Sequence, residues 1–253
     1  MTRQGVWRGL ISQHGLSMLE MTLVLLAASL LSWAAMAAYA TVERDRERAQ
    51  GLAQAQQMQV ALRAFAMRHG RLPCPDTGGS GYEAAGCPTG ALVGGYPYAS
   101  VGLDVPPLGL RARYAVFRQA SATPGQDADL TVALERTGDA PGDLHHRDVT
   151  DLIVGLNNAA ALPVSTSHPH LTGDGSGPAG NVDCAANRVT LVAYWIVLPQ
   201  RDSNGDGEVL DPPHVATGLC VASPSAPMRS DFDDIVRAES PAQLAGWLRR
   251  SMP

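Results

Sequence analysis

The feature that most constrains this chain is an apolar run near its N-terminus. Residues 16–40 contain a single charged side chain, Glu20. About 20 consecutive apolar residues are enough to cross a bilayer as an α-helix, so we predict a transmembrane helix over residues 16–40. Arg3 and Arg8 precede the run, and acidic and arginine residues alternate after it at 43–48. Arginines on the N-terminal side favour a cytoplasmic N-terminus and an exported C-terminal part.

Glu20 is the exception within this run. A carboxylate at the bilayer centre costs about 2.5–3.5 kcal/mol on insertion scales, and a position near the end of the span lowers that cost. If the chain were cut after Gly15, a new amino terminus would form at Leu16, one helical turn from Glu20. That cation can pair with the carboxylate of the same chain or of a neighbouring chain, which would satisfy an otherwise isolated charge.

The sequence around this position, HGLSMLEM at residues 14–21, resembles the type IV prepilin cleavage motif. Members of that family are cut after a glycine and then carry an apolar residue first and a glutamate fifth, positions that Gly15, Leu16 and Glu20 match. The family usually has phenylalanine first, so Leu16 departs from the pattern. The resemblance implies cleavage after Gly15 by prepilin peptidase, methylation of the Leu16 amino group, and an α+β fold in which a long N-terminal helix packs on a small antiparallel sheet.

The resemblance also implies the partners and the location of the chain. Pilin-like subunits contact one another through their N-terminal helices, and they meet prepilin peptidase and an inner-membrane assembly platform. The expected location is the bacterial inner membrane, with a single span and the head in the periplasm or in an extracellular filament.

Two simpler interpretations compete with a prepilin. One is a secretory signal that ends at the A-x-A sequence of residues 38–40. Such signals have an apolar region of about 7–15 residues, without an acid. The other is a plain signal anchor in which Glu20 has no role, which is disfavoured because an acid in a membrane span is costly.

We predict three parts: a leader at residues 1–15, an N-terminal helix at 16–69 and a globular head at 70–253. Good helix formers fill residues 49–68. Apolar side chains trace one stripe there, namely Leu52, Ala55, Met58 or Gln59, Leu62, Phe65 and Ala66. A single helix would be ~80 Å long and would end at Gly70. The alternative is two helices with a break at Gly51.

The head reads as a mixture of loops, strands and helices. Residues 71–110 are dense in glycine and proline and predict a loop region. The start of this region, RLPCPD at 71–76, resembles one subgroup of large pilin-like proteins. Beyond it we predict strands at residues 111–118, 130–134, 188–198 and 234–237, and helices at 149–162 and 241–250.

Four cysteines, Cys74, Cys87, Cys184 and Cys220, lie outside the apolar run and form no C-x-x-C motif. An even number of cysteines in an exported chain predicts two disulfides. Four cysteines permit three connectivities. Proximity in sequence favours Cys74–Cys87, which leaves Cys184–Cys220 as the second pair.

An acidic segment follows the predicted strand at 188–198. Its alternating oxygen-bearing side chains resemble the first half of a calcium loop. An EF-hand is excluded because its twelfth position is Pro213. A simpler calcium site remains as a prediction, with ligands drawn from Asp202, Asn204, Asp206, Glu208 and Asp211. The alternative is a polar turn whose acids face water.

Composition argues against several other functions. All 19 basic residues are arginines, so neither a Walker-type phosphate loop nor Schiff-base catalysis is available. A net charge of -5 and 5% aromatic residues argue against nucleic-acid binding. The G-x-G-x-x-G pattern at 175–180 contains Pro178 and follows no predicted strand. The histidines at 145, 146, 168 and 170 lie in loop-like sequence and are expected to be solvated.

These observations predict a structural protein and no enzyme. The large head and residues 71–76 favour a minor pilin of a type IV pilus. The alternatives are a pseudopilin of a type II secretion system and a membrane-anchored periplasmic binding protein or enzyme.

Overall fold

In a computed structural model of the chain, the described residues are 17–173, 181–202, 205–226 and 233–252. Contacts divide the chain into two compact units, Met1–Arg48 and Ala49–Pro253. The helix α1 (Met18–His69) is continuous through that boundary. The second half of α1 therefore belongs to the head, and the predicted single N-terminal helix is confirmed.

The second half of α1 is amphipathic, and its apolar stripe enters the core. The buried residues recur at helical spacing, as predicted: Gly51, Ala55, Met58, Leu62, Phe65 and Ala66. The hydroxyl of the buried Tyr96 donates to the Met58 carbonyl oxygen at 2.7 Å. The helix ends where Gly70 adopts a positive φ of 59° and donates to the Ala66 carbonyl.

Gly51 does not break α1, so the two-helix alternative is wrong. Its role is close packing against β7 (Ile235–Glu239). A Cβ added at Gly51 would lie 2.5 Å from Ile235 Cδ1 and 2.7 Å from Gln200 Oε1. The missing side chain therefore lets strand and helix approach, at the modest cost in helix propensity that glycine carries.

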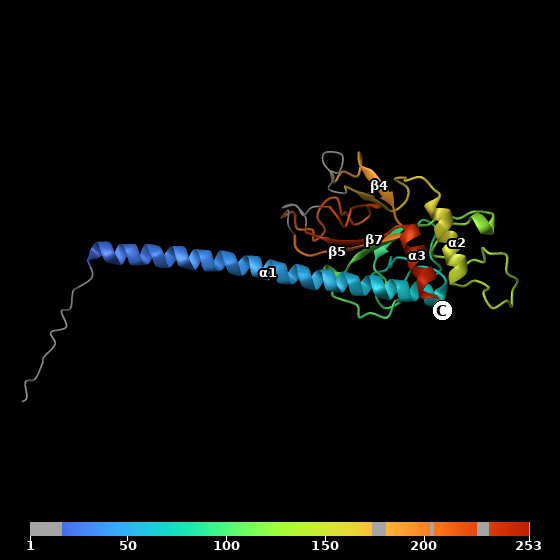
Figure 1. The fold of residues 1–253 in the computed structure, drawn as a ribbon, viewed down its shortest axis with the longest axis horizontal. Helices are drawn as coiled ribbons and strands as arrows, with labels where there is room; N and C mark the ends of the chain where they lie inside the picture. The colour runs from blue at the N-terminus through green and yellow to red at the C-terminus, as the bar shows by residue number, and fades with distance from the viewer. Residues whose placement is uncertain (1–16, 174–180, 203–204, 227–232, 253) are drawn as a thin grey trace, which may run out of the picture. The chain divides into compact units, whose positions relative to one another are not determined.

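Two sheets build the head (Figure 1). The first is fully antiparallel and has the order β1-β2-β5-β7, with β1 at Val93–Gly95, β2 at Arg113–Val116 and β5 at Tyr194–Leu198. In the second, β3 (His170–Thr172) lies between β4 (Arg188–Leu191) and β6 (Cys220–Ala222), antiparallel to β4 and parallel to β6.

The helices α2 (Val149–Ala160) and α3 (Pro241–Ser251) pack against each other (Figure 1). Both begin with a reciprocal capping box, from Asp148 and Asp151 in α2 and from Ser240 and Gln243 in α3. The described part of the chain also contains two 3₁₀ turns, η1 (Leu108–Leu110) and η2 (Pro124–Gln126). The predicted helices at 149–162 and 241–250 are confirmed.

The four-stranded sheet is the central layer, because β5 is buried on both faces. Tyr194, Ile196 and Leu198 point into a core that the three helices share. Trp195 and Val197 point the other way, into a second core that includes side chains from β3 and β6. Alternating residues of one apolar strand thus bind a helical layer and a second sheet.

The predicted strand at 188–198 is two strands in two different sheets. Val192 and Ala193 make the transition between β4 and β5. The Val192 amide donates to the Pro169 carbonyl, and the Ala193 amide donates to the Glu239 carbonyl. Because its hydrogen-bond partners change between these neighbouring residues, an uninterrupted apolar run serves both sheets. The strand predicted at 111–118 is shorter, and β1 lies inside the region predicted as loop.

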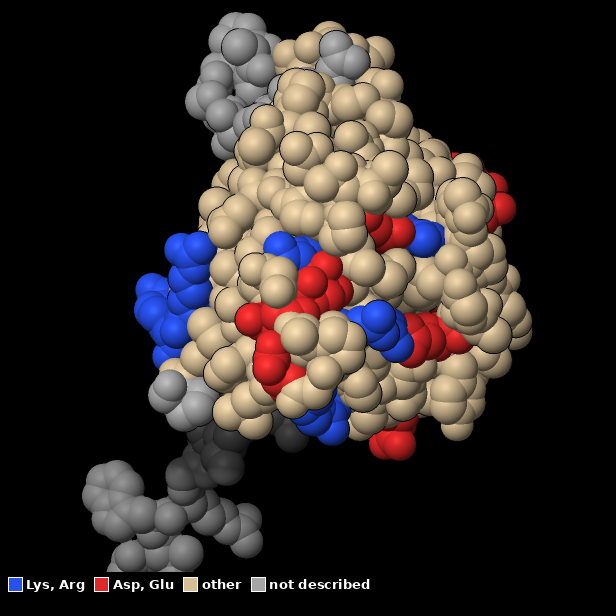
Figure 2. All heavy atoms as spheres, turned by 90° about the vertical axis from the view of Figure 1, so that its right-hand side faces the viewer, with Lys and Arg blue, Asp and Glu red and all other residues tan. Residues whose placement is uncertain are grey.

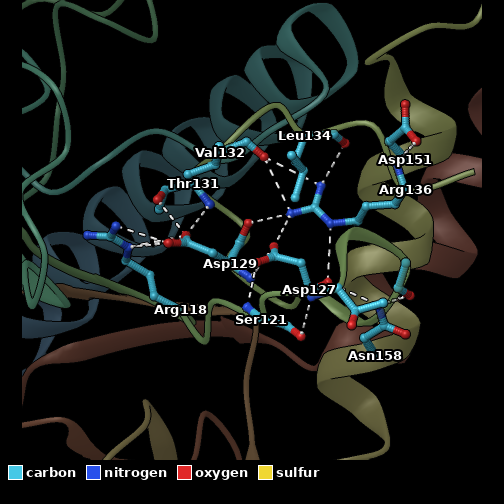
Figure 3. A network of polar contacts seen from close by, with 12 residues as sticks. Arg118, Ser121, Asp127, Asp129, Thr131, Val132, Leu134, Arg136, Asp151 and Asn158 are labelled. Carbon is cyan, nitrogen blue, oxygen red and sulfur yellow. Dashed lines mark hydrogen bonds and ion pairs between the residues drawn. The ribbon is translucent and has the colours of Figure 1, made fainter. Parts of the chain in front are cut away.

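The strand predicted at residues 130–134 is wrong, since the segment forms turns. It curls around the guanidinium of Arg136, whose side chain is 0% exposed (Figure 3). Arg136 donates to the carbonyl oxygens of Asp129 at 2.7 Å and Leu134 at 3.2 Å, and to Asp127 Oδ1 at 2.7 Å. A strand would direct these carbonyls to a neighbouring strand. Here the buried Arg136 guanidinium donates hydrogen bonds to these carbonyl oxygens instead.

Neighbouring acids complete this network. The carboxylate of Asp129 pairs with Arg118 at 3.0 Å and accepts from the Thr131 amide (Figure 3). Asp151 of α2 accepts from the Arg136 amide at 2.5 Å and from the Thr137 amide at 3.0 Å. The loop between β2 and α2 is therefore fixed by buried, paired charges rather than by a sheet.

We predict that Arg136→Met destabilises the head by about 3–5 kcal/mol, because it leaves the buried Asp127 carboxylate without its cation. Chemical denaturation of the full chain in detergent measures this change. Arg249→Met, at an exposed position in the last turn of α3, is the matched control and should leave the midpoint nearly unchanged. Equal midpoints for the two variants would contradict the assignment of Arg136 as the centre of the loop.

Candidate functional site

The first half of α1 is apolar around its whole circumference. Every described side chain from residue 17 to 42 is exposed within the chain, and the large apolar ones range from Met18 at 91% to Val42 at 49%. Among the described residues, α1 is the one helix long and apolar enough to cross a membrane. A helix without a polar face is stable only when lipid or other apolar helices cover it.

Three hydroxyl side chains in this half bond to the helix backbone. The hydroxyls of Thr22, Ser29 and Thr41 donate to the carbonyl oxygens three residues earlier, at 2.8, 2.8 and 2.7 Å. These bonds remove the need for a partner in water. The hydroxyl groups are therefore compatible with an apolar environment, and Glu20 stays the one charged side chain of residues 17–42.

Glu20 forms a capping box with Ser17. The Ser17 amide donates to Glu20 Oε2 at 2.8 Å, and the Glu20 amide donates to Ser17 Oγ at 3.2 Å. This arrangement satisfies two of the amides that a helix start leaves without partners. It also fixes the carboxylate at the positive end of the helix dipole. Ser-x-x-Glu before an apolar run is the sequence signature of this cap, although the cap was not among the predictions.

Of the three predicted processing residues, the structure describes Glu20. Gly15 and Leu16 lie outside the described residues, so cleavage after Gly15 stays a prediction. The glycine-rich pattern at 175–180 also lies outside the described residues.

Within the head, Arg63 of α1 is held by groups from three other elements. Its Nε lies 3.1 and 3.2 Å from the two carboxylate oxygens of Glu239 in β7. Tyr194 of β5 donates its hydroxyl to the same carboxylate. The Arg63 guanidinium lies 4.9 Å from the centre of the Trp247 ring in α3. Arg63 thus joins α1 to the four-stranded sheet and to α3.

The electrostatics of this cluster follow from burial and pairing. The hydrogen bond to Glu239 holds the pKa of Arg63 above its usual value. Burial, reinforced by the adjacent Glu239, raises the pKa of Tyr194 well above its usual value. An open hollow of about 470 Å³ lies beside the cluster, and Glu239 is the one carboxylate in its lining. Because the Glu239 carboxylate already pairs with Arg63, it stabilises the packing of α1 against β7.

Both predicted disulfides are present. Cys74 and Cys87 are bonded with a Cα–Cα distance of 5.6 Å, and Cys184 and Cys220 with a distance of 5.9 Å. The first closes the loop that follows α1, and the second ties β6 to the segment before β4. Cross-links of this kind limit the freedom of the unfolded chain and are typical of oxidising compartments.

Two of the residues predicted to bind calcium, Asp202 and Asp206, accept hydrogen bonds from backbone amides. The Asp202 carboxylate accepts from the amides of Gly205 at 2.6 Å and Gly207 at 2.8 Å. Asp206 accepts from the Glu208 amide at 2.8 Å. Asp211 is fully buried, and Asn204 lies outside the described residues. Within the described ranges, no three His, Cys, Asp or Glu side chains come together as metal ligands, so the calcium prediction finds no support in this geometry.

The histidines differ from one another in environment. His145 is exposed, as predicted, and lies 2.9 Å from the Asp148 carboxylate. The prediction of a solvated side chain is wrong for His170, which is 2% exposed in β3. Its Nδ1–H donates to the carbonyl oxygen of His168 at 2.8 Å.

Several charges on the head are paired. Among the described residues, four arginine–carboxylate pairs are present, namely Arg63–Glu239, Arg71–Glu83, Arg118–Asp129 and Arg136–Asp127. On the face in Figure 2, acidic side chains gather near the centre, with arginines beside them. A nucleic-acid interface would present a basic surface, and this face is of mixed charge.

Comparison of the chain with protein-family models, with curated proteins and with solved structures finds no match in any of the three. The features that bear on function are therefore the sequence motif, the uncovered apolar half of α1 and the groups that fix this helix at its two ends.

We predict that Ser17→Ala frays the first turn of α1, because the amide of Glu20 loses its acceptor. Loss of such a cap costs about 0.5–2 kcal/mol, so amide hydrogen exchange at residues 18–20 should accelerate in detergent micelles. Ser17→Thr, which keeps a hydroxyl acceptor, is the matched control. Unchanged exchange in Ser17→Ala would show that the cap does not hold this turn.

Proposed function

We propose that this chain is a pilin-like structural subunit of a type IV pilus or a related filament. In this proposal, prepilin peptidase cuts after Gly15, and the apolar half of α1 assembles with the same helix of other subunits. The observation that supports this proposal most directly is a helix whose apolar surface is uncovered from residue 17 to 42. The same helix holds one carboxylate in its first turn.

The position of Glu20 supports a filament subunit over a plain anchor. A membrane anchor gains nothing from an acid, which raises the cost of insertion. A filament core, in contrast, can place the carboxylate beside the amino group that cleavage would create at Leu16. The capping box with Ser17 keeps the carboxylate at that end of the helix. Such pairing of opposite charges is effective away from water.

The head supports a structural role in an exported location. Two disulfides and a set of paired buried charges give it rigidity. The arginines at 3 and 8 favour a cytoplasmic leader. We therefore propose an inner-membrane precursor whose head lies in the periplasm and then in the filament. The size of the head, residues 70–253, favours a low-abundance minor pilin, and a type II secretion pseudopilin is the related alternative.

The mature N-terminus tests this proposal. We expect mass spectrometry of the chain from membranes of its native cells to find Leu16 first, with an N-methyl group. The mature chain would keep 238 of 253 residues, and the loss of Arg3 and Arg8 would change the formal charge from -5 to -7. An N-terminus at Thr41, as a secretory signal predicts, or an intact Met1 would refute the proposal.

Two substitutions at Glu20 separate its charge from its capping role. Glu20→Gln keeps an oxygen that can accept from the Ser17 amide, whereas Glu20→Ala removes both the acceptor and the charge. We expect both variants to insert and to be cleaved, and both to be reduced in sheared surface filaments relative to membranes. Immunoblotting of the two fractions measures this. Normal incorporation of Glu20→Gln would mean that Glu20 acts as a cap and not as a charge partner.

A further inference from the structure

A buried imidazole connects the two sheets of the head. His214 precedes β6, and its Nδ1 lies 2.9 Å from Oδ2 of Asp234, directly before β7. Its Nε2 accepts from the amide of Ala222, in β6, at 3.1 Å. The side chains of His214 and Asp234 are 1% and 0% exposed. The ring therefore links β6 of the three-stranded sheet to the start of β7 in the four-stranded sheet.

These two bonds define the protonation state of the ring. A backbone amide can only donate, so Nε2 carries no proton. A carboxylate oxygen can only accept when ionised, so the single proton of the neutral ring lies on Nδ1. A second proton has to go to Nε2, where it would face the Ala222 N–H. Two donors at that distance repel each other, so proton uptake requires the bond to open.

Charged and titratable groups surround the ring on several elements. Asp211, in the same segment, donates its amide to Asp234 Oδ2 at 3.2 Å, and its carboxylate acts on Asp234. Arg113 of β2 donates to the carbonyl oxygen of Ala216 in the loop that follows His214. His170 of β3 lies in the strand paired with β6. The ring is thus part of a buried polar cluster between the two sheets.

We propose that His214 is an acid-sensitive latch between the two sheets, which holds β6 while the ring is neutral and releases it when the ring takes up a proton. The released strand carries Cys220 of the second disulfide. This inference is independent of the proposed filament function, because it depends on contacts within the head alone.

The neighbouring acid would give a response of opposite sign. Burial raises the pKa of Asp234, against the hydrogen bonds that His214 and Asp211 donate. An acid whose pKa is raised in the folded state stabilises that state as the pH falls, and this stabilisation is lost as the pH rises through the raised pKa. Titration of Asp234 alone would therefore stabilise the folded state in acid, whereas protonation of His214 opens the link between the sheets.

Hydrogen exchange at the Ala222 amide tests the latch in the full chain in detergent. After correction for intrinsic rates, we expect protection at Ala222 to fall about tenfold between pH 7.5 and 5.5, because the opened ring can take up a proton that the closed ring cannot. The Phe117 amide, which donates to the Ala193 carbonyl in the central sheet, is the internal reference and should keep its protection.

Two variants complete the experiment. His214→Gln should have the same Ala222 protection at both pH values. His145→Gln, which alters an exposed histidine, should retain the tenfold fall. The proposal is overturned if parental Ala222 protection is constant or rises in acid, or if Phe117 loses protection in parallel, which would mean general unfolding. A tenfold fall that persists in His214→Gln would also overturn it. If His214→Gln does not fold, the test is the protection of the Ala222 amide relative to the Phe117 amide in the parental chain at the two pH values.

Discussion

The apolar first half of α1 cannot remain in water. Its large side chains are exposed on all sides within the chain, and each buried apolar side chain of this size contributes about 1.5–3 kcal/mol when it leaves water. The hydroxyl groups of Thr22, Ser29 and Thr41 already bond to the helix backbone. The one charged side chain of residues 17–42 is Glu20. A lipid environment satisfies the apolar surface and leaves the carboxylate, whereas a bundle of such helices with free amino termini would satisfy both.

The second half of the same helix buries its apolar side chains within the chain itself. Its apolar stripe is covered by the head, and glycine at position 51 lets β7 come close. Arg63 then joins the helix to Glu239, Tyr194 and Trp247, while the Tyr96 hydroxyl holds the Met58 carbonyl. Apolar packing and charge-assisted bonds therefore fix α1 to the head over the stretch where it needs no lipid.

Local and periodic signals in the sequence predicted much of this structure. The helix α1, the two later helices and both disulfides follow from periodicity, capping residues and cysteine spacing. What failed depended on distant partners. The segment at 130–134 has strand-like composition, but Arg136 donates to the carbonyl oxygens of Val132 and Leu134. Residues 188–198 read as one strand because both sheets bury apolar residues. The change of hydrogen-bond partner at Val192 has no signal in the local sequence. The Ser17–Glu20 cap has a local signature in the sequence, but it was not predicted.

The central claim is that other subunits cover the apolar half of α1. A photoreactive residue at Leu30, which is exposed within the chain, tests it directly in living cells. The expected result is a covalent adduct with another filament subunit, lost in cells without the assembly platform. Adducts with lipid alone, in cells that assemble filaments, would contradict the claim and leave a simple membrane anchor.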